Sequence, residues 1–88
     1  MNILLIEDED KIADFVMTGL NEAGMQAEHL TDGSAGLQRA LSTPFDAIVI
    51  DLMLPGLDGI SIIKHLRKSG LTTPLVLLTA KTDLQDRL

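Results

Sequence analysis

Four residues that can bind a cation or react with a phosphoryl group stand at the ends of apolar runs. Glu7 and Asp8 follow the first such run, Asp51 follows the third, and Thr79 ends the fourth. Carboxylate and hydroxyl oxygens are the ligands that a hard cation such as Mg2+ prefers. A carboxylate can also accept a phosphoryl group covalently as an acyl phosphate, while a bound cation neutralises charge on that group. The four residues therefore predict phosphoryl chemistry if the fold brings them together.

The apolar runs have the length of strands. They are Asn2–Ile6, Met25–Leu30, Phe45–Ile50 and Leu75–Thr79. Three of them show no polar alternation, which is typical of strands buried on both faces of a parallel sheet. Met25–Leu30 is diluted by Gln26, Glu28 and His29, so we expect this strand at an edge of the sheet.

Segments with the helical spacing of apolar residues lie between the runs. The first ends at Gly24, the second follows the turn 31–34 and is broken at Pro44, and the third is Ile60–Lys68, ended by Gly70. The side chains expected to face the sheet are Ile12, Phe15, Val16, Leu20 and Ala23 in the first helix, Leu37, Ala40 and Leu41 in the second, and Ile60, Ile63 and Leu66 in the third. A further helix is expected to begin within Asp83–Leu88.

This order of strands and helices predicts an α/β fold with a doubly wound parallel sheet, built from right-handed strand–helix–strand units. Open sheets of this kind bind ligands outside the carboxyl ends of their strands. If the first, third and fourth strands lie side by side, then Glu7, Asp8, Asp51 and Thr79 converge on one edge of the sheet.

Length and composition limit the alternatives. The chain has 88 residues, enough for one domain, and its 45% hydrophobic and 23% charged residues are typical of globular proteins. The formal net charge of −6 argues against a nucleic-acid-binding face on this segment. The chain has no cysteine, which excludes disulfides and thiol catalysis, and no apolar run is long enough for a signal peptide or a membrane helix. We therefore expect a cytoplasmic protein that contacts no membrane.

Other polar residues have simpler explanations. Glu9 and Asp10 fit the acidic first turn of a helix, where the helix dipole favours negative charge. His29 and His65 show no ligand spacing and are expected to be surface residues. The sequence after Asp51 cannot form an EF-hand, because it lacks oxygen ligands at alternate positions, and no glycine-rich phosphate-binding loop is present.

Three sequence blocks and their spacing resemble the receiver domains of two-component response regulators. The blocks are ILLIEDED at the first strand, IVIDLMLPGLDG around the third and TPLVLLTA at the fourth. The residues of these blocks are most similar to those of the OmpR-like class. The resemblance implies a flavodoxin-like receiver with strand order 2-1-3-4 and the fifth strand missing. It also implies a phosphoacceptor module that receives a phosphoryl group from a sensor histidine kinase and is not itself an enzyme.

The resemblance assigns a role to each residue of the expected site. Asp51 would be the phosphoacceptor. Glu7 and Asp8 would hold Mg2+ together with Asp51 and the backbone carbonyl of Met53. Thr79 would hydrogen-bond the phosphoryl oxygen and shift inward on activation.

The resemblance also implies supporting roles nearby and a larger parent protein. Pro55 and Gly59 would shape the loop after the acceptor, and Ala80 would leave room for the phosphoryl group. The parent would be a transcriptional regulator that binds DNA through a winged-helix domain absent from this chain.

The chain departs from the family pattern at its end. Residues 1–88 would form a receiver that lacks most of the fourth helix, the fifth strand and the fifth helix, and with them the family's phosphoryl-pairing Lys. Lys81 follows the fourth strand and does not replace that Lys. We expect slow or absent phosphorylation as a result. We also expect either self-association through the uncovered fourth strand, because an apolar strand edge is a template for pairing, or a partly folded chain.

Two other functions remain to be weighed. A haloacid-dehalogenase-like phosphohydrolase also uses an Asp after a parallel strand, but it needs a second acid two residues on, where this chain has Met53. An interaction domain without phosphorylation would keep the fold and lose the chemistry. Retention of Glu7, Asp8, Asp51 and Thr79 argues against it, whereas the missing Lys keeps this alternative open for residues 1–88.

Overall fold

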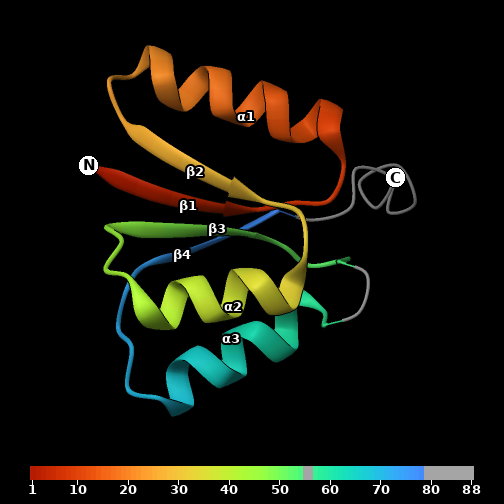
Figure 1. The fold of residues 1–88 in the computed structure, drawn as a ribbon, viewed down its shortest axis with the longest axis vertical. Coiled ribbons are helices and arrows are strands. Elements are labelled where there is room, and N and C mark those ends of the chain that lie inside the picture. Colours follow the sequence, from red (N-terminus) through yellow and green to blue (C-terminus); the bar gives the residue numbers. More distant parts are fainter. Residues whose placement is uncertain (55–56, 79–88) are drawn as a thin grey trace, which may run out of the picture.

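A computed structural model describes residues 1–54 and 57–78, which form one parallel sheet covered by helices (Figure 1). The elements in chain order are β1 (Asn2–Ile6), α1 (Asp10–Glu22), β2 (Gln26–Leu30), α2 (Gly33–Ser42), β3 (Ala47–Asp51), α3 (Gly59–Lys68) and β4 (Leu75–Leu78). All neighbouring strands are parallel, and the strand order is β2-β1-β3-β4. The predicted α/β class, the strand order and the edge position of β2 are confirmed.

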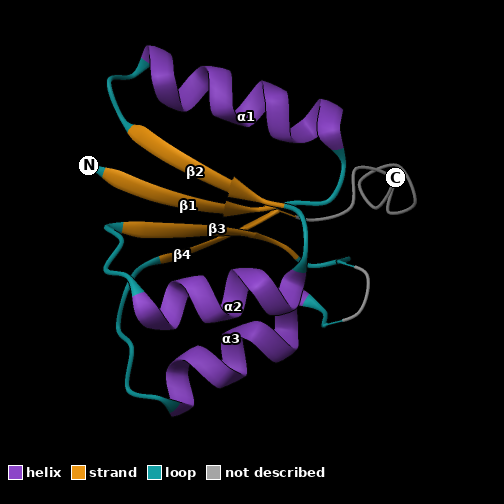
Figure 2. Ribbon diagram, viewed as in Figure 1, coloured by secondary structure: helices purple, strands orange, loops and turns teal. Residues whose placement is uncertain are grey.

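Helices lie on both sides of the sheet (Figure 2), and apolar residues pack between the helices and the sheet on each side. Helix α1 covers one face, and its layer is built on Ile3, Leu5, Ala13 and Val49. Helices α2 and α3 cover the other face, where the buried residues include Leu4, Ile6, Ile48 and Ile50. Adjacent residues of β1 and β3 thus point into opposite layers, which explains why these strands carry continuous aliphatic runs rather than an alternating pattern.

Helix α1 meets the sheet through a stripe that only partly matches the predicted one, because Val16 and Leu20 face inward as expected. The inward residues are Ala13, Val16, Met17 and Leu20, at the 3–4 spacing of one helix face. Phe15 was expected inward, but its side chain is 81% exposed. It lies two residues from Ala13, which is about 200° around the helix, so both cannot face the sheet.

Helices α2 and α3 also bury only part of the face that the sequence predicted. Small residues decide the buried face of α2, where Gly33, Gly36 and Ala40 are buried and Leu41 is about half-exposed. In α3 the buried residues are Gly59, Ile62 and Leu66, while Ile60 is about half-exposed. Leu41 and Ile60 were therefore predicted on the wrong face, because apolar spacing alone allowed two phases of each helix.

Local signals set the helix ends. The side chain of Asp32 accepts a hydrogen bond from the Ala35 N–H at the start of α2, and Asp58 does the same for the Ser61 N–H at the start of α3. Gly24 and Gly70 follow α1 and α3 with φ of 82° and 91°, a left-handed conformation that favours glycine.

Strand β4 is the least covered strand of the described sheet. Leu75 and Leu78 are partly buried, whereas Val76 and Leu77, which point to opposite faces, are about half-exposed. The prediction that both faces of this strand require cover is therefore not met within residues 1–54 and 57–78. Self-association through β4 stays a prediction. The helix expected to begin within Asp83–Leu88 lies outside the described residues. None of the helices described is long and apolar enough to cross a membrane.

Candidate functional site

The carboxyl ends of β1 and β3 bring three carboxylates together. The two strands are adjacent, with Ile6 opposite Ile50 in the register, so the residues that follow them meet at one edge of the sheet. Glu7, Asp8 and Asp51 each offer an oxygen atom, and these atoms all lie within 4.8 Å of one another. The predicted convergence of these three residues is confirmed.

Glu7 is the buried member of this acidic cluster, which we define as Glu7, Asp8 and Asp51. Its residue surface is only 1% exposed, and its Oε2 accepts a hydrogen bond of 3.0 Å from the Glu9 N–H. Burial raises the pKa of the Glu7 carboxyl to about 7, with smaller contributions from Asp51 and Asp8, against the opposing effect of the Glu9 N–H. The ionised form of Glu7 is thus disfavoured by burial and by repulsion from the neighbouring carboxylates. A bound cation would offset both effects.

Asp51 is oriented by the backbone that follows it. Its Oδ1 accepts a hydrogen bond of 3.0 Å from the Met53 N–H, which turns the chain sharply after β3. The Met53 side chain is 65% exposed. The carbonyl of Met53 stays a predicted metal ligand.

Gly59 allows the start of α3 to lie against the end of β3. A Cβ atom at this position would come within 2.6 Å of the Asp51 carbonyl oxygen and 2.8 Å of the Leu52 Cα. Such distances are too short for any side chain, so only glycine fits. The expected role of Gly59 in shaping the loop after Asp51 therefore has a packing basis. Pro55, Thr79, Ala80 and Lys81 lie outside the described residues.

His29 is a residue that the sequence analysis placed wrongly at the surface. It is partly buried, and its Nε2 lies 2.7 Å from the backbone carbonyl oxygen of Glu7. Its position could have indicated this contact, because His29 is the next-to-last residue of β2, the strand that pairs with β1. His65 is exposed as expected.

The comparisons with known proteins identify the family. Residues 3–88 match the response regulator receiver domain, and the chain belongs to this family of two-component regulators. Receiver domains bind Mg2+ at an acidic site. The acidic cluster lies where the fold places such a site, outside the carboxyl ends of the parallel strands.

Curated relatives of the chain are transcriptional regulators. It is 41% identical over 87 residues to the transcriptional regulatory protein QseB of Escherichia coli O157:H7, covering 99% of this chain and 40% of that protein. It is 42% identical over 87 residues to the transcriptional activator protein IrlR of Burkholderia pseudomallei, covering 99% of this chain and 38% of that protein. The chain thus spans about two-fifths of the length of these relatives.

Solved receiver domains share the fold. The receiver domain of the Francisella response regulator 1452 is 38% identical with a TM-score of 0.87, over 97% of this chain and 70% of that one. The receiver domain of the Pseudomonas aeruginosa sensor histidine kinase PA1611 is 30% identical with a TM-score of 0.84, over 98% and 72% of the two chains. The latter structure has a magnesium ion coordinated in its active-site cleft.

Proposed function

We propose that Asp51 accepts a phosphoryl group from the phosphohistidine of a sensor histidine kinase, at a Mg2+ site formed by Glu7, Asp8 and Asp51. The observation that carries this proposal is the convergence of three carboxylates on the carboxyl edge of β1 and β3. The phosphoryl group ends on the protein itself. We therefore propose a signalling module and not an enzyme that turns over a separate substrate.

The donor set fits Mg2+. Three carboxylates supply hard oxygen ligands and negative charge, and Asp8 is exposed, so water can complete the coordination. The carbonyl of Met53 is proposed as a further ligand. When bound, Mg2+ would neutralise charge on the phosphoryl oxygens and so lower the barrier to transfer.

The residues of the chain perform the transfer by holding one carboxylate in place. An oxygen of Asp51 forms the new bond to phosphorus while the bond from phosphorus to the histidine nitrogen of the kinase breaks, and that nitrogen keeps the electron pair. The hydrogen bond from the Met53 N–H to Oδ1 fixes the orientation of the attacking group. Thr79 is proposed to hydrogen-bond the transferred group and to act as the switch.

The kinase is proposed to approach the carboxyl edge of the sheet beside α1. Of the apolar residues on α1, Val16 packs toward the sheet, whereas Phe15 exposes most of its side chain. Phe15 is thus the available anchor for a partner. The whole protein is proposed to be a cytoplasmic DNA-binding transcriptional regulator, with its winged-helix domain outside this segment.

A melt followed by circular dichroism tests the site in the 88-residue chain. The ligand is Mg2+ with beryllium fluoride, which mimics an acyl phosphate on the carboxylate. A ligand that binds the folded state at about 100 times its dissociation constant adds about 2.7 kcal/mol of stability, so the midpoint should rise clearly. Asp51→Asn, which removes the acceptor oxygen with little change of shape, should abolish the rise. An equal rise in that variant would contradict the proposal.

A further inference from the structure

The side chain of His29 reaches the backbone of the acidic cluster from the neighbouring strand. His29 pairs with Leu5 in the register of β1 and β2, and its Nε2 lies 2.7 Å from the Glu7 carbonyl oxygen. A carbonyl oxygen can only accept a hydrogen bond, so Nε2 must carry the hydrogen. The imidazole is therefore a donor to the main chain at the point where β1 ends.

This contact adds a further hydrogen bond between β1 and β2 at the point where the two strands end. The Glu7 N–H donates to the Leu30 carbonyl at 3.0 Å, in the manner of a parallel ladder. Strand β2 ends at Leu30, and the carbonyl on the other side of Glu7 is met by a side chain, that of His29. Both backbone polar groups of Glu7 are thus held by β2.

Holding the Glu7 carbonyl also determines where Asp8 lies. The peptide group that joins Glu7 to Asp8 is planar, so fixing its oxygen fixes the direction in which the Asp8 Cα leaves. Asp8 is exposed, and its side chain gains no support from burial. The position of its carboxylate against those of Glu7 and Asp51 consequently depends on this peptide.

We propose that His29 is a positioning residue for the cation site, and that its Nε2–H holds the Glu7–Asp8 peptide in the orientation that brings the three carboxylates together. This inference rests on the proposed function, because it concerns the same Mg2+ site. Removing a residue that hydrogen-bonds to a metal ligand, without itself contacting the metal, typically weakens metal binding about 10- to 100-fold. His29 acts here on the backbone that carries two ligands and not on a ligand side chain.

Titration calorimetry of Mg2+ against two substitutions tests the role. His29→Leu removes the donor, whereas His29→Gln keeps an N–H at similar reach. We expect the Leu variant to bind Mg2+ about tenfold more weakly than the wild type and the Gln variant to stay within about threefold. Glu28→Gln is the matched control on the same strand, since Glu28 bonds Arg39 rather than the site, and it should bind Mg2+ like the wild type.

The outcomes separate the inference from the function on which it rests. A Leu variant that binds Mg2+ as tightly as the wild type, or a Gln variant as weak as the Leu variant, would overturn the positioning role alone. A wild-type chain that binds no Mg2+ would overturn the proposed function and the positioning role together.

A measurement without metal keeps the test open if the Leu variant does not fold. Nitrogen-15 spectra of the wild-type imidazole should show hydrogen on Nε2, and the Glu7 carbonyl carbon should show the shift of a hydrogen-bonded group. The Gln variant should preserve that carbonyl shift. An imidazole with hydrogen on Nδ1 alone would rule out the contact and the inference with it.

Discussion

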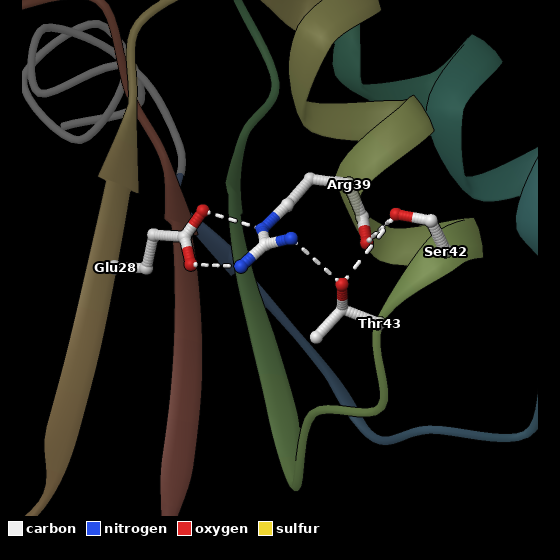
Figure 3. A network of polar contacts seen from close by, with 4 residues as sticks. All are labelled: Glu28, Arg39, Ser42 and Thr43. Atoms are coloured by element: carbon white, nitrogen blue, oxygen red, sulfur yellow. Dashed lines mark hydrogen bonds and ion pairs between the residues drawn. The ribbon is translucent and has the colours of Figure 1, made fainter.

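Two groups of charged side chains on this domain are arranged in opposite ways. Glu28 of β2 and Arg39 of α2 form a bidentate ion pair, with nitrogen–oxygen distances of 2.7 and 2.9 Å (Figure 3). Arg39 also donates to the Thr43 hydroxyl at 2.9 Å, so its guanidinium is held on two sides. The acidic cluster instead collects three carboxylates, and no Lys or Arg within residues 1–54 and 57–78 forms an ion pair with it.

The pKa shifts of the ion pair and of the acidic cluster differ in the same way. The hydrogen bond from Arg39 lowers the pKa of the Glu28 carboxyl, and Glu28 raises the pKa of the Arg39 guanidinium. Burial and neighbouring carboxylates raise the pKa of Glu7. The ion pair joins α2 to the edge strand β2 in the folded chain. The acidic cluster has no ion pair with Lys or Arg in the described part of the chain. An uncompensated group of like charges is thus the better guide to function on this surface.

The substitution Glu7→Gln is expected to have the largest effect, which is a change in the free energy of unfolding of the metal-free protein. The folded pKa of Glu7 is about 7 against an ordinary value of 4.5, so its contribution to stability is present below pH 4.5 and is lost as the pH rises through 7. A shift from 4.5 to about 7 corresponds to about 3 kcal/mol. Urea unfolding with a chelator present should therefore show that Glu7→Gln gains about that much over the wild type at pH 8 and little at pH 4.5.

Asp8→Asn is the control for this prediction. Asp8 makes the smallest of the contributions that raise the pKa of Glu7, so this variant should keep most of the pH dependence of the wild type. Equal pH profiles for the wild type and Glu7→Gln would show that Glu7 titrates normally and that the contrast between the two charged groups is wrong.

An intermediate effect is expected on the pH dependence of Mg2+ affinity. Below pH 7 the cation must displace the proton of Glu7, so the affinity for Mg2+ decreases as the pH is lowered. A displaced proton with a pKa of about 7 makes binding about tenfold weaker at pH 6 than at pH 8. Calorimetry at the two pH values should show this ratio in the wild type and a smaller one in Glu7→Gln. An unchanged dissociation constant in the wild type would contradict the link between Glu7 and the cation.

The smallest effect is expected from Arg39→Gln. The ion pair with Glu28 is exposed, and exposed pairs contribute little to stability and are screened by salt. The melting midpoint should fall slightly at low salt, and the difference from the wild type should shrink in high salt. Mg2+ affinity should not change. A large change in that affinity would mean that the two charged groups are coupled and not independent.

Much of the fold was predictable from the sequence because its signals are local. Continuous aliphatic runs indicated buried parallel strands, and the turn residues Gly24 and Gly70 ended helices where expected. The buried faces of the helices were predicted less well. Four residues that were expected inward are exposed: Phe15, Ala23, Leu41 and Ile60. Apolar spacing gives a helix more than one possible buried stripe, and the close approach of glycines and alanines to the sheet decides among them.

The sequence by itself determined which residues could hold a cation and that Glu7, Asp8 and Asp51 each stand at the end of an apolar run. The sequence predicted the adjacency of β1 and β3 only through its family resemblance. The tertiary structure decided that the three carboxylates lie within 4.8 Å of one another. It also decided that Glu7 is buried and that His29 of β2 reaches its carbonyl. Pairing of strands and burial arise from contacts between residues far apart in the chain, and no local pattern of residue types encodes a distance across the sheet.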